Sequence, residues 1–244
     1  MKRAHLILLA ACAASLAGAE PAAEAPTAPQ LLREVLAQLP RESLHLQGRL
    51  RTRKRHGIVT REVGFDLSVQ WGRSPSVAAY TIRDALGRDL ERLVVERDPQ
   101  GPPRLQYFFG DPLAPAAAPD LAAAVRETDV SWFDLTLSFL WWEGRSIVRS
   151  EEVKGRDCYV VEVAPPAGAA APYARGLLWI DRELRVLLQA EGYDGEGRLL
   201  RRLWVKSVKK VEDRWMIKDM EIQAFPAVTR TELSVQDVDV GGPP

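Results

Sequence analysis

The chain has 244 residues, with 33 basic and 33 acidic side chains, three histidines and two cysteines. Its formal net charge of zero provides no general field that would attract nucleic acid. Without residues 1–19, Cys158 is the one remaining cysteine, so no internal disulfide can form. The remaining length, about 225 residues, suits one β domain stabilised by its core.

The first residues have the pattern of a secretory signal peptide. Lys2 and Arg3 precede an apolar run from Leu6 to Leu16, and residues 17–19 (Ala-Gly-Ala) form a small-residue cleavage site. This run is too short to cross a membrane. The tetrapeptide ending at Cys12 also resembles a bacterial lipobox, which would make Cys12 a lipidated N-terminus. Both alternatives predict export to the periplasm.

The chain between the signal peptide and the end of the expected domain divides into a leader and a single domain. Residues 20–30 are rich in Ala, Pro and Glu, and we expect a flexible leader there. Residues 31–240 are the expected domain. It begins with an amphipathic helix over 30–39, which ends at Pro40.

A period of two then replaces the helical period. Residues 44–51 alternate between apolar and polar side chains, and after a turn at 56–57 a longer strand follows. One face of that strand is apolar almost throughout: Val59, Val63, Phe65, Leu67, Val69 and Trp71. Shorter strands are predicted at 77–83, 89–97 and 104–109, and regular short strands with turns favour a barrel-like or sandwich sheet.

A Pro/Ala-rich insertion at 110–130 interrupts the strands, with a short helix expected at 119–126. The segment 131–142 follows, and Ser131 can cap a helix whose first turn contains Asp134. That helix would be apolar nearly all round, so protein or ligand must cover it. Its candidate covering residues are Trp132, Phe133, Leu137, Leu140 and Trp141.

The remainder of the chain is predicted to be strands. Strands at 145–154 and 157–164 precede an antiparallel meander of four or five strands from Tyr173 to Val240, whose connections are too short for parallel crossovers. Within it Met216, Met220 and Ile222 share one face. The prediction is a mostly β (α+β) fold with one antiparallel sheet of about eleven strands.

Four segments of the chain resemble the outer-membrane lipoprotein-sorting protein family of bacteria, the LolA-like superfamily. They read SWFDLTLSFL, KGRDCYVVEVAPP, LLWIDRELRVLLQAEGYDGEGRLLRRLWVKSVKKVEDRWMIKDMEIQ and TRTELSVQDV. The resemblance implies an unclosed LolA/LolB-like half-barrel whose concave apolar face is covered by a helical lid. It also implies a periplasmic protein that shelters acyl chains. Members of the superfamily include carriers, receptors and envelope-stress sensors, so the fold does not fix the role.

Two interpretations of the apolar residues remain open. The wall of a lipid cavity is one, and an ordinary side-chain-filled barrel core is the other. The candidate wall residues are Val59, Val63, Phe65, Leu67, Val69, Trp71, Met216, Met220 and Ile222. The segment 131–142 is in the same way either a lid or a packed helix, and Trp141 and Trp142 could also enter a membrane interface. The basic run 49–55 is read as a solvated outer face, with anionic lipid headgroups or an acidic partner as the alternative.

Motifs of enzymes and metal sites are missing from the sequence. His45 and His56 belong to no HExxH, HxH or Cys-His pattern, and Cys158 lies within a strand, where an inert thiol is expected. We expect no enzyme, metal or cofactor; a hydrolase would require a Ser or Cys beside one histidine. The expected function is a monomeric carrier of lipid acyl chains or lipoproteins, served by an inner-membrane transporter or an outer-membrane receptor. The alternative is a non-carrying sensor or protein-interaction module.

Overall fold

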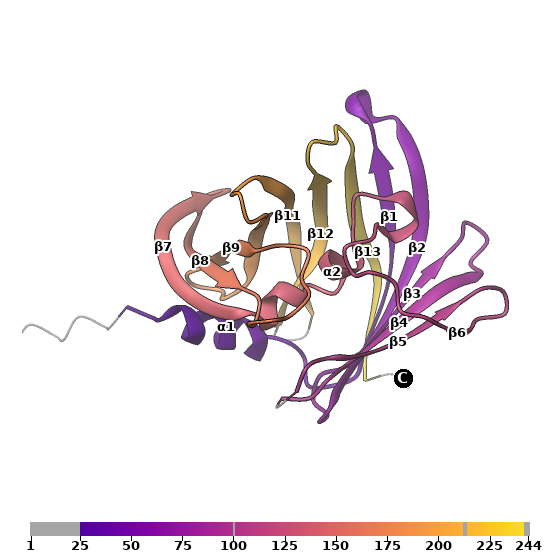
Figure 1. Cartoon of the computed structure of the whole chain (residues 1–244), viewed down its shortest axis with the longest axis horizontal. Helices are drawn as coiled ribbons and strands as arrows, with labels where there is room; N and C mark the ends of the chain where they lie inside the picture. Colours follow the sequence, from indigo (N-terminus) through magenta and orange to yellow (C-terminus); the bar gives the residue numbers. More distant parts are fainter. Residues whose placement is uncertain (1–24, 100, 212–213, 242–244) are drawn as a thin grey trace, which may run out of the picture.

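The computed structural model describes residues 25–99, 101–211 and 214–241, which form one antiparallel sheet with few helices (Figure 1). Its 13 strands are β1 Leu44–Arg53, β2 Val59–Gln70, β3 Ser76–Arg83, β4 Asp89–Arg97, β5 Arg104–Phe109, β6 Ala114–Ala116, β7 Glu143–Val153, β8 Arg156–Ala164, β9 Arg175–Asp181, β10 Leu187–Tyr193, β11 Leu199–Val211, β12 Arg214–Ala224 and β13 Arg230–Val240. The helical segments are α1 Ala28–Ala37, η1 Arg55–Gly57, η2 Val125–Glu127, α2 Trp132–Leu135 and η3 Ser138–Trp141.

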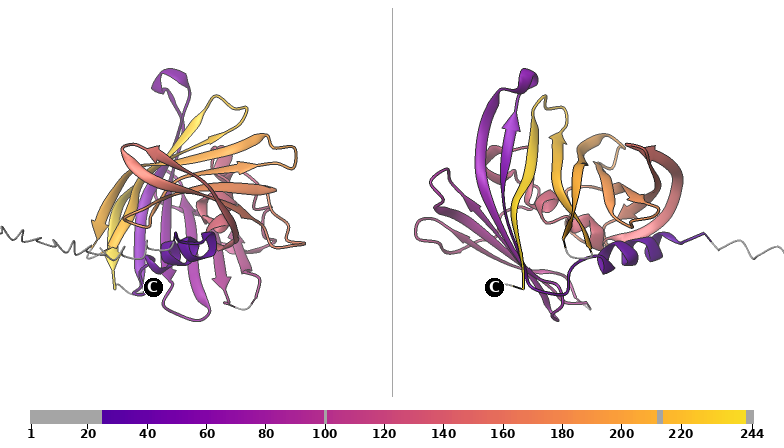
Figure 2. Two further views of the ribbon diagram at one scale, coloured as in Figure 1. Left: turned by 90° about the vertical axis from the view of Figure 1, so that its left-hand side faces the viewer. Right: turned by 180° about the vertical axis from the view of Figure 1, so that it is seen from behind.

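Neighbouring strands of the sheet are consecutive in sequence with one exception. The order is β6-β5-β4-β3-β2-β1-β13-β12-β11-β10-β9-β8-β7, so β1 pairs with the last strand, β13. This pair joins an N-terminal half, β1–β6, to a C-terminal half, β7–β13. The sheet curls without closing, and β6 and β7 are its two edges within the described chain (Figures 1 and 2). The predicted antiparallel meander is present as the five strands β9–β13.

Two features of the insertion at 110–130 differ from the prediction. It contains a three-residue strand, β6, that its Pro/Ala-rich composition does not suggest, and the sheet has 13 strands in the described chain rather than about eleven. The expected helix at 119–126 is not formed. The Asp120 carboxylate accepts the backbone N–H of Ala122 at 2.9 Å, and Arg126 and Glu127 have positive φ. Both features favour turns over a continuous helix.

Residues 131–142, here named the covering segment, are also not the single helix that the apolar pattern predicted. Ser131 caps the helix as predicted, Asp134 completes a capping box with it, and α2 then lasts one turn. The Thr136 hydroxyl donates to the Phe133 carbonyl at 3.1 Å, and Leu137 adopts a left-handed conformation with φ of 48°. A left-handed residue cannot continue an α-helix, so the chain restarts as η3.

The N-terminal helix packs beside the edge strand β7 and η3. It begins at Ala28, capped by Thr27, rather than at residue 30, and it buries Leu31, Leu32 and Val35. Residues 25–27 precede the helix, whereas the signal peptide, Cys12 and residues 20–24 of the expected leader lie outside the described residues. No helix in the described ranges is long and apolar enough to cross a membrane.

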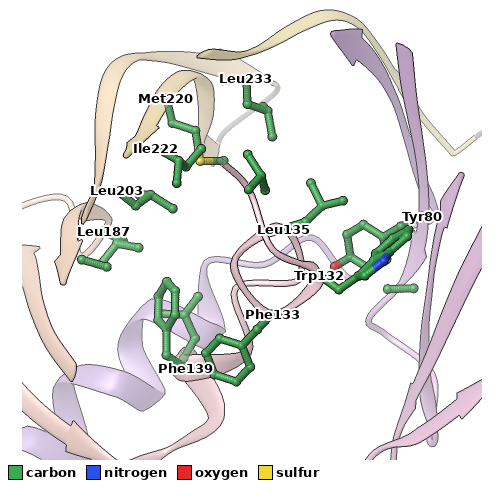
Figure 3. Close-up of a cluster of buried hydrophobic side chains, with 14 of the residues drawn as sticks. Tyr80, Trp132, Phe133, Leu135, Phe139, Leu187, Leu203, Met220, Ile222 and Leu233 are labelled. Atoms are coloured by element: carbon green, nitrogen blue, oxygen red, sulfur yellow. The ribbon is translucent and has the colours of Figure 1, made fainter. Parts of the chain in front are cut away.

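The two faces of the sheet differ in chemistry. On the concave face the buried side chains of the strands and of the covering segment point into one interior (Figure 3). On the convex face Arg49 and Arg51 each contact Glu62 at 2.8 Å, and Arg53 contacts Glu232 at 3.0 Å. Hydrogen bonding from Arg51 lowers the pKa of Glu62. The arginines 49, 51 and 53 of the basic run are therefore paired with acids on an outer face.

Candidate functional site

An apolar cavity of about 170 Å³ lies between the concave face and the covering segment. Its wall is built from the end of α1, strands β1–β3, the start of β10, strands β12 and β13, and residues 135–141. Nearly all of the lining side chains are apolar. Among the described residues the hydrophilic ones are Gln38, Thr136 and Arg185. Such a wall offers area and shape to an apolar guest and few directional contacts.

The sequence-predicted wall residues divide into three groups. Five line the cavity: Phe65, Leu67, Trp71, Met216 and Met220. Val63, Val69 and Ile222 are buried in the surrounding core without lining it. Val59 is 47% exposed and lies outside this wall. It is the first residue of β2, next to the protruding β1–β2 hairpin, which extends beyond the cavity (Figure 2). Strand alternation therefore identified the correct face but not where the cavity ends along it.

Phe65 owes its position to the glycine opposite it. Gly48 on β1 pairs with Phe65 on β2, and a Cβ atom at Gly48 would lie 2.5 Å from the Phe65 ring. The same Cβ atom would lie even closer to the Ser234 carbonyl oxygen, so no larger residue fits there unless both the ring and the backbone of β13 move. The single glycine in the predicted alternation 44–51 thus makes room for the cavity wall.

The five predicted covering residues fall into two groups, those that line the cavity and those that pack elsewhere. Leu137, Leu140 and Trp141 line the cavity. Trp132 instead packs edge-on against Tyr107, with ring centroids 6.2 Å apart. Phe133 contacts the rings of Phe139, Trp142 and Tyr173 at 5.2–6.2 Å. Trp142 is buried in this aromatic cluster, so it does not lie at the surface, where a membrane interface would require it.

Several residues that line the cavity are missing from the set predicted from the sequence. Four of them could have been found from strand alternation, which places them on the concave face: Leu46, Tyr80, Leu233 and Val235. Val35 and Leu39 belong to the apolar face of the predicted N-terminal helix. Others depend on tertiary packing, which periodicity does not reveal: Pro40, Leu135, Arg185, Val186, Leu187, Trp215 and Ile217.

The α2 half of the covering segment is fixed to the sheet by buried polar groups. The Asp134 carboxylate accepts hydrogen bonds from the Ser131 hydroxyl at 2.5 Å and the Tyr173 hydroxyl at 2.6 Å. Arg201 on β11 lies 3.3 Å from the same carboxylate and also donates to the Asp129 carbonyl. Burial and the neighbouring carboxylate raise the pKa of Tyr173. We name Ser131, Asp134, Tyr173 and Arg201 the polar anchor.

The η3 half is held differently. The Arg97 guanidinium stacks over the Trp141 ring at 4.0 Å and donates to the Ser138 hydroxyl at 3.0 Å. Burial lowers the pKa of Arg97, and burial also raises that of the neighbouring Tyr80 to about 12. The Ser138 hydroxyl also shares a hydrogen bond of 2.7 Å with the Thr136 hydroxyl, inside the covering segment itself. The other side-chain contacts of η3 are apolar, through Phe139 and Leu140. One cation and apolar surface therefore hold this half.

The outer face of β1 and β2 brings a serine and an acid to one histidine. His45 Nδ1 lies 2.9 Å from Ser68 Oγ, and His45 Nε2 lies 3.1 Å from Asp66 Oδ2. This meets the proximity that a hydrolase requires. However, β1 and β2 are each paired on both sides, so their backbone N–H groups belong to the sheet ladders. N–H groups engaged in ladders are not free to stabilise an oxyanion, the interaction from which acyl-transfer enzymes gain most of their rate.

Cys158 does not form a reactive centre. Its thiol is buried beside Val160, Leu177 and Trp179, and burial raises its pKa to about 11. The thiolate is therefore scarce at neutral pH. No cluster of three metal-binding side chains was found among the residues that the structure describes.

The unclosed antiparallel sheet with a segment over its concave face is a fold that other proteins share. Three solved structures share this fold. A DUF1329 family protein from Desulfovibrio piger is 16% identical with a TM-score of 0.73, covering 86% of this chain and 90% of its own. An outer membrane lipoprotein-sorting protein domain from Vibrio parahaemolyticus is 14% identical with a TM-score of 0.73, covering 87% and 92%. A LolA superfamily protein from Nitrosomonas europaea is 15% identical with a TM-score of 0.67, covering 90% and 96%.

The sequence comparison identifies the family more directly. A protein-family model described as "-like: Uncharacterized protein" matches residues 116–243. This range is more than half of the chain, so the protein belongs to that family. No curated protein matches the chain in sequence. The resemblance inferred from the sequence is confirmed, whereas identities of 14–16% establish the fold and not the cargo.

Proposed function

We propose that this protein binds acyl chains of lipids or lipoproteins in the cavity under the covering segment, as a carrier in the bacterial envelope. The observation that supports it is the apolar cavity itself, about 170 Å³ in volume. Burial contributes about 0.8 kcal/mol for each CH₂ group, so a sixteen-carbon chain gains roughly 10 kcal/mol before association costs. No covalent step is involved.

The size of the cavity requires the covering segment to move. An apolar cavity of about 150 Å³ holds a guest the size of benzene, so the present cavity admits only part of a long acyl chain. The η3 half is the part that moves, because an acyl chain can replace the apolar contacts of Leu140 and Phe139. It cannot replace the hydrogen bonds of the polar anchor, so α2 stays in place.

The expected cellular setting completes this proposal. Export by the signal peptide 1–19, or lipidation at Cys12, would place the protein in the periplasm or on a membrane facing it. Two of the structures with this fold are described as a lipoprotein-sorting domain and a LolA superfamily protein, which supports an envelope role. A monomer would receive cargo from an inner-membrane transporter or deliver it to an outer-membrane receptor.

Native mass spectrometry of protein purified from a periplasm without detergent tests the carrier function. We expect stoichiometric lipid on the wild type and less on Phe65→Asp or Leu137→Asp. The control is Ile58→Asp, since Ile58 is 63% exposed at a hairpin far from the wall. A folded protein that stays empty after incubation with phospholipid and lipoprotein contradicts the proposal.

A non-carrying interaction module is the second candidate, and the edge strand β7 favours it. Most side chains of its 11 residues are exposed, and an unpaired strand edge can accept a partner strand. Recovery of one stoichiometric protein and no lipid would support this alternative. A hydrolase is not proposed, and we expect a fluorophosphonate probe to leave Ser68 unmodified.

A further inference from the structure

Arg185 is the one charged side chain among the described residues that line the apolar cavity. Its side chain is 27% exposed, so it reaches both the cavity and the solvent. A cation in this position is unnecessary for holding an acyl chain, and an apolar residue would contribute more to the wall. The cation must therefore either bind part of a ligand or hold the structure together.

The turn between β9 and β10 holds Arg185 rigidly. The buried Asp181 carboxylate accepts the backbone N–H groups of Glu183 and Leu184 at 2.8 Å. Arg156 also donates to this carboxylate, at 2.5 and 2.9 Å. Arg185 itself has a φ of 54°, a conformation that a loose turn would avoid. The guanidinium thus projects from a preformed support.

Only part of the donor capacity of Arg185 is used. Nε lies 2.7 Å from Glu34 on α1, and one terminal nitrogen donates to the Arg182 carbonyl. A guanidinium has five N–H groups, and no further hydrogen bond of the Arg185 side chain is formed within the described ranges. One face of the guanidinium lies over the Tyr159 ring, 5.8 Å from its centroid. The planar geometry of the N–H groups matches a carboxylate or a phosphate.

We propose that the cavity takes a single-chain amphiphile with an anionic headgroup, whose carboxylate or phosphate binds Arg185 while the tail lies under the covering segment. This inference rests on the proposed acyl-chain binding and specifies its ligand class. Glu34 acts as the resident counterion when the site is empty. It competes with the headgroup and limits the affinity.

The test compares three ligands with the same tail: dodecanoate, dodecyl phosphate and dodecanol. Their dissociation constants are measured by displacement of an apolar fluorescent probe, at about pH 8, where the carboxylate is ionised. The wild type should prefer both anions over the alcohol by about tenfold, which corresponds to about 1.4 kcal/mol. Arg185→Gln should abolish the preference without changing dodecanol binding.

Two further variants make the result specific. Arg182→Gln is the matched control, because Arg182 lies on the same turn but does not line the cavity. It should keep the preference. Glu34→Gln removes the competing carboxylate and should tighten dodecanoate binding severalfold, and it decides the question if Arg185→Gln does not fold.

Each contrary outcome is distinguishable. If dodecanol binds the wild type as tightly as both anions, or if the preference survives Arg185→Gln, the headgroup inference is overturned and the carrier function stands. If only one anion is preferred, that anion is the headgroup class and the inference is supported for it alone. If none of the three ligands binds, the carrier function and the inference both fail.

Discussion

The two halves of the covering segment are attached to the same sheet by different chemistry. The α2 half ends in a buried carboxylate, Asp134, that receives two hydroxyl hydrogen bonds and lies beside Arg201. The η3 half is held by apolar contacts and by Arg97. Apolar contacts can be exchanged for those of another apolar molecule at little cost, whereas buried hydrogen bonds cannot. One continuous segment therefore combines an end fixed by hydrogen bonds, α2, with an end held mainly by replaceable apolar contacts, η3.

The largest expected effect comes from removing the centre of the polar anchor. Asp134→Ala leaves the Tyr173 hydroxyl and the Arg201 guanidinium without their carboxylate. We expect the free energy of unfolding to fall by about 3 kcal/mol, measured by chemical denaturation. Glu152→Ala, on the exposed outer part of β7, should change it by less than about 0.5 kcal/mol. Equal losses for the two variants would refute the anchor.

The pH dependence of stability probes the same anchor. The pKa of Tyr173 is raised in the folded state, so the folded protein holds this proton more tightly than the unfolded chain. Its contribution is fully present below about pH 10, the unfolded pKa, and is lost as pH rises toward the folded pKa. Urea titrations above pH 10 should show a stability loss of about 1.4 kcal/mol per pH unit that Tyr173→Phe removes. An unchanged slope in the variant would contradict this assignment.

A smaller effect is expected in the η3 half of the covering segment. Arg97→Gln removes the stacking on Trp141 and weakens the bond to Ser138, so the free energy of unfolding should decrease by about 1–2 kcal/mol. Hydrogen exchange should accelerate in residues 138–142 and remain unchanged in 132–135. Arg104→Gln is the control, since Arg104 is 67% exposed on β5. Faster exchange across both halves would mean that they move together.

The smallest effect on stability is expected from Leu137→Ala. Leu137 is only partly buried and lines the cavity, so the free energy of unfolding should change by less than about 1 kcal/mol. Dodecanol affinity should nevertheless fall about threefold, because the guest loses contact area. Leu86→Ala, at a site 80% exposed, should alter neither quantity. Unchanged dodecanol affinity would place the guest elsewhere.

The sequence predicted the strands well because alternation along a half-buried sheet is a local signal. The face containing Phe65, Leu67 and Trp71 follows from period two alone. The break at Leu137 could not be predicted, since a leucine carries no signal for a left-handed backbone and the Thr136 hydroxyl competes with the helix only in context. Arg185 was missed for a related reason: a charged turn residue is ordinarily solvated, and only tertiary packing brings it to the cavity.

The connectivity of the sheet has a consequence for ligand affinity. Its two edges, β6 and β7, follow one another in sequence, and the linker between them, residues 117–142, contains the covering segment. The cover is therefore tethered at both ends, and its apolar face is an intramolecular competitor at high effective concentration. The observed dissociation constant then equals the intrinsic constant divided by the fraction of open molecules. Under the proposed carrier function, the linker would tune both uptake and release of cargo without any change in the cavity wall.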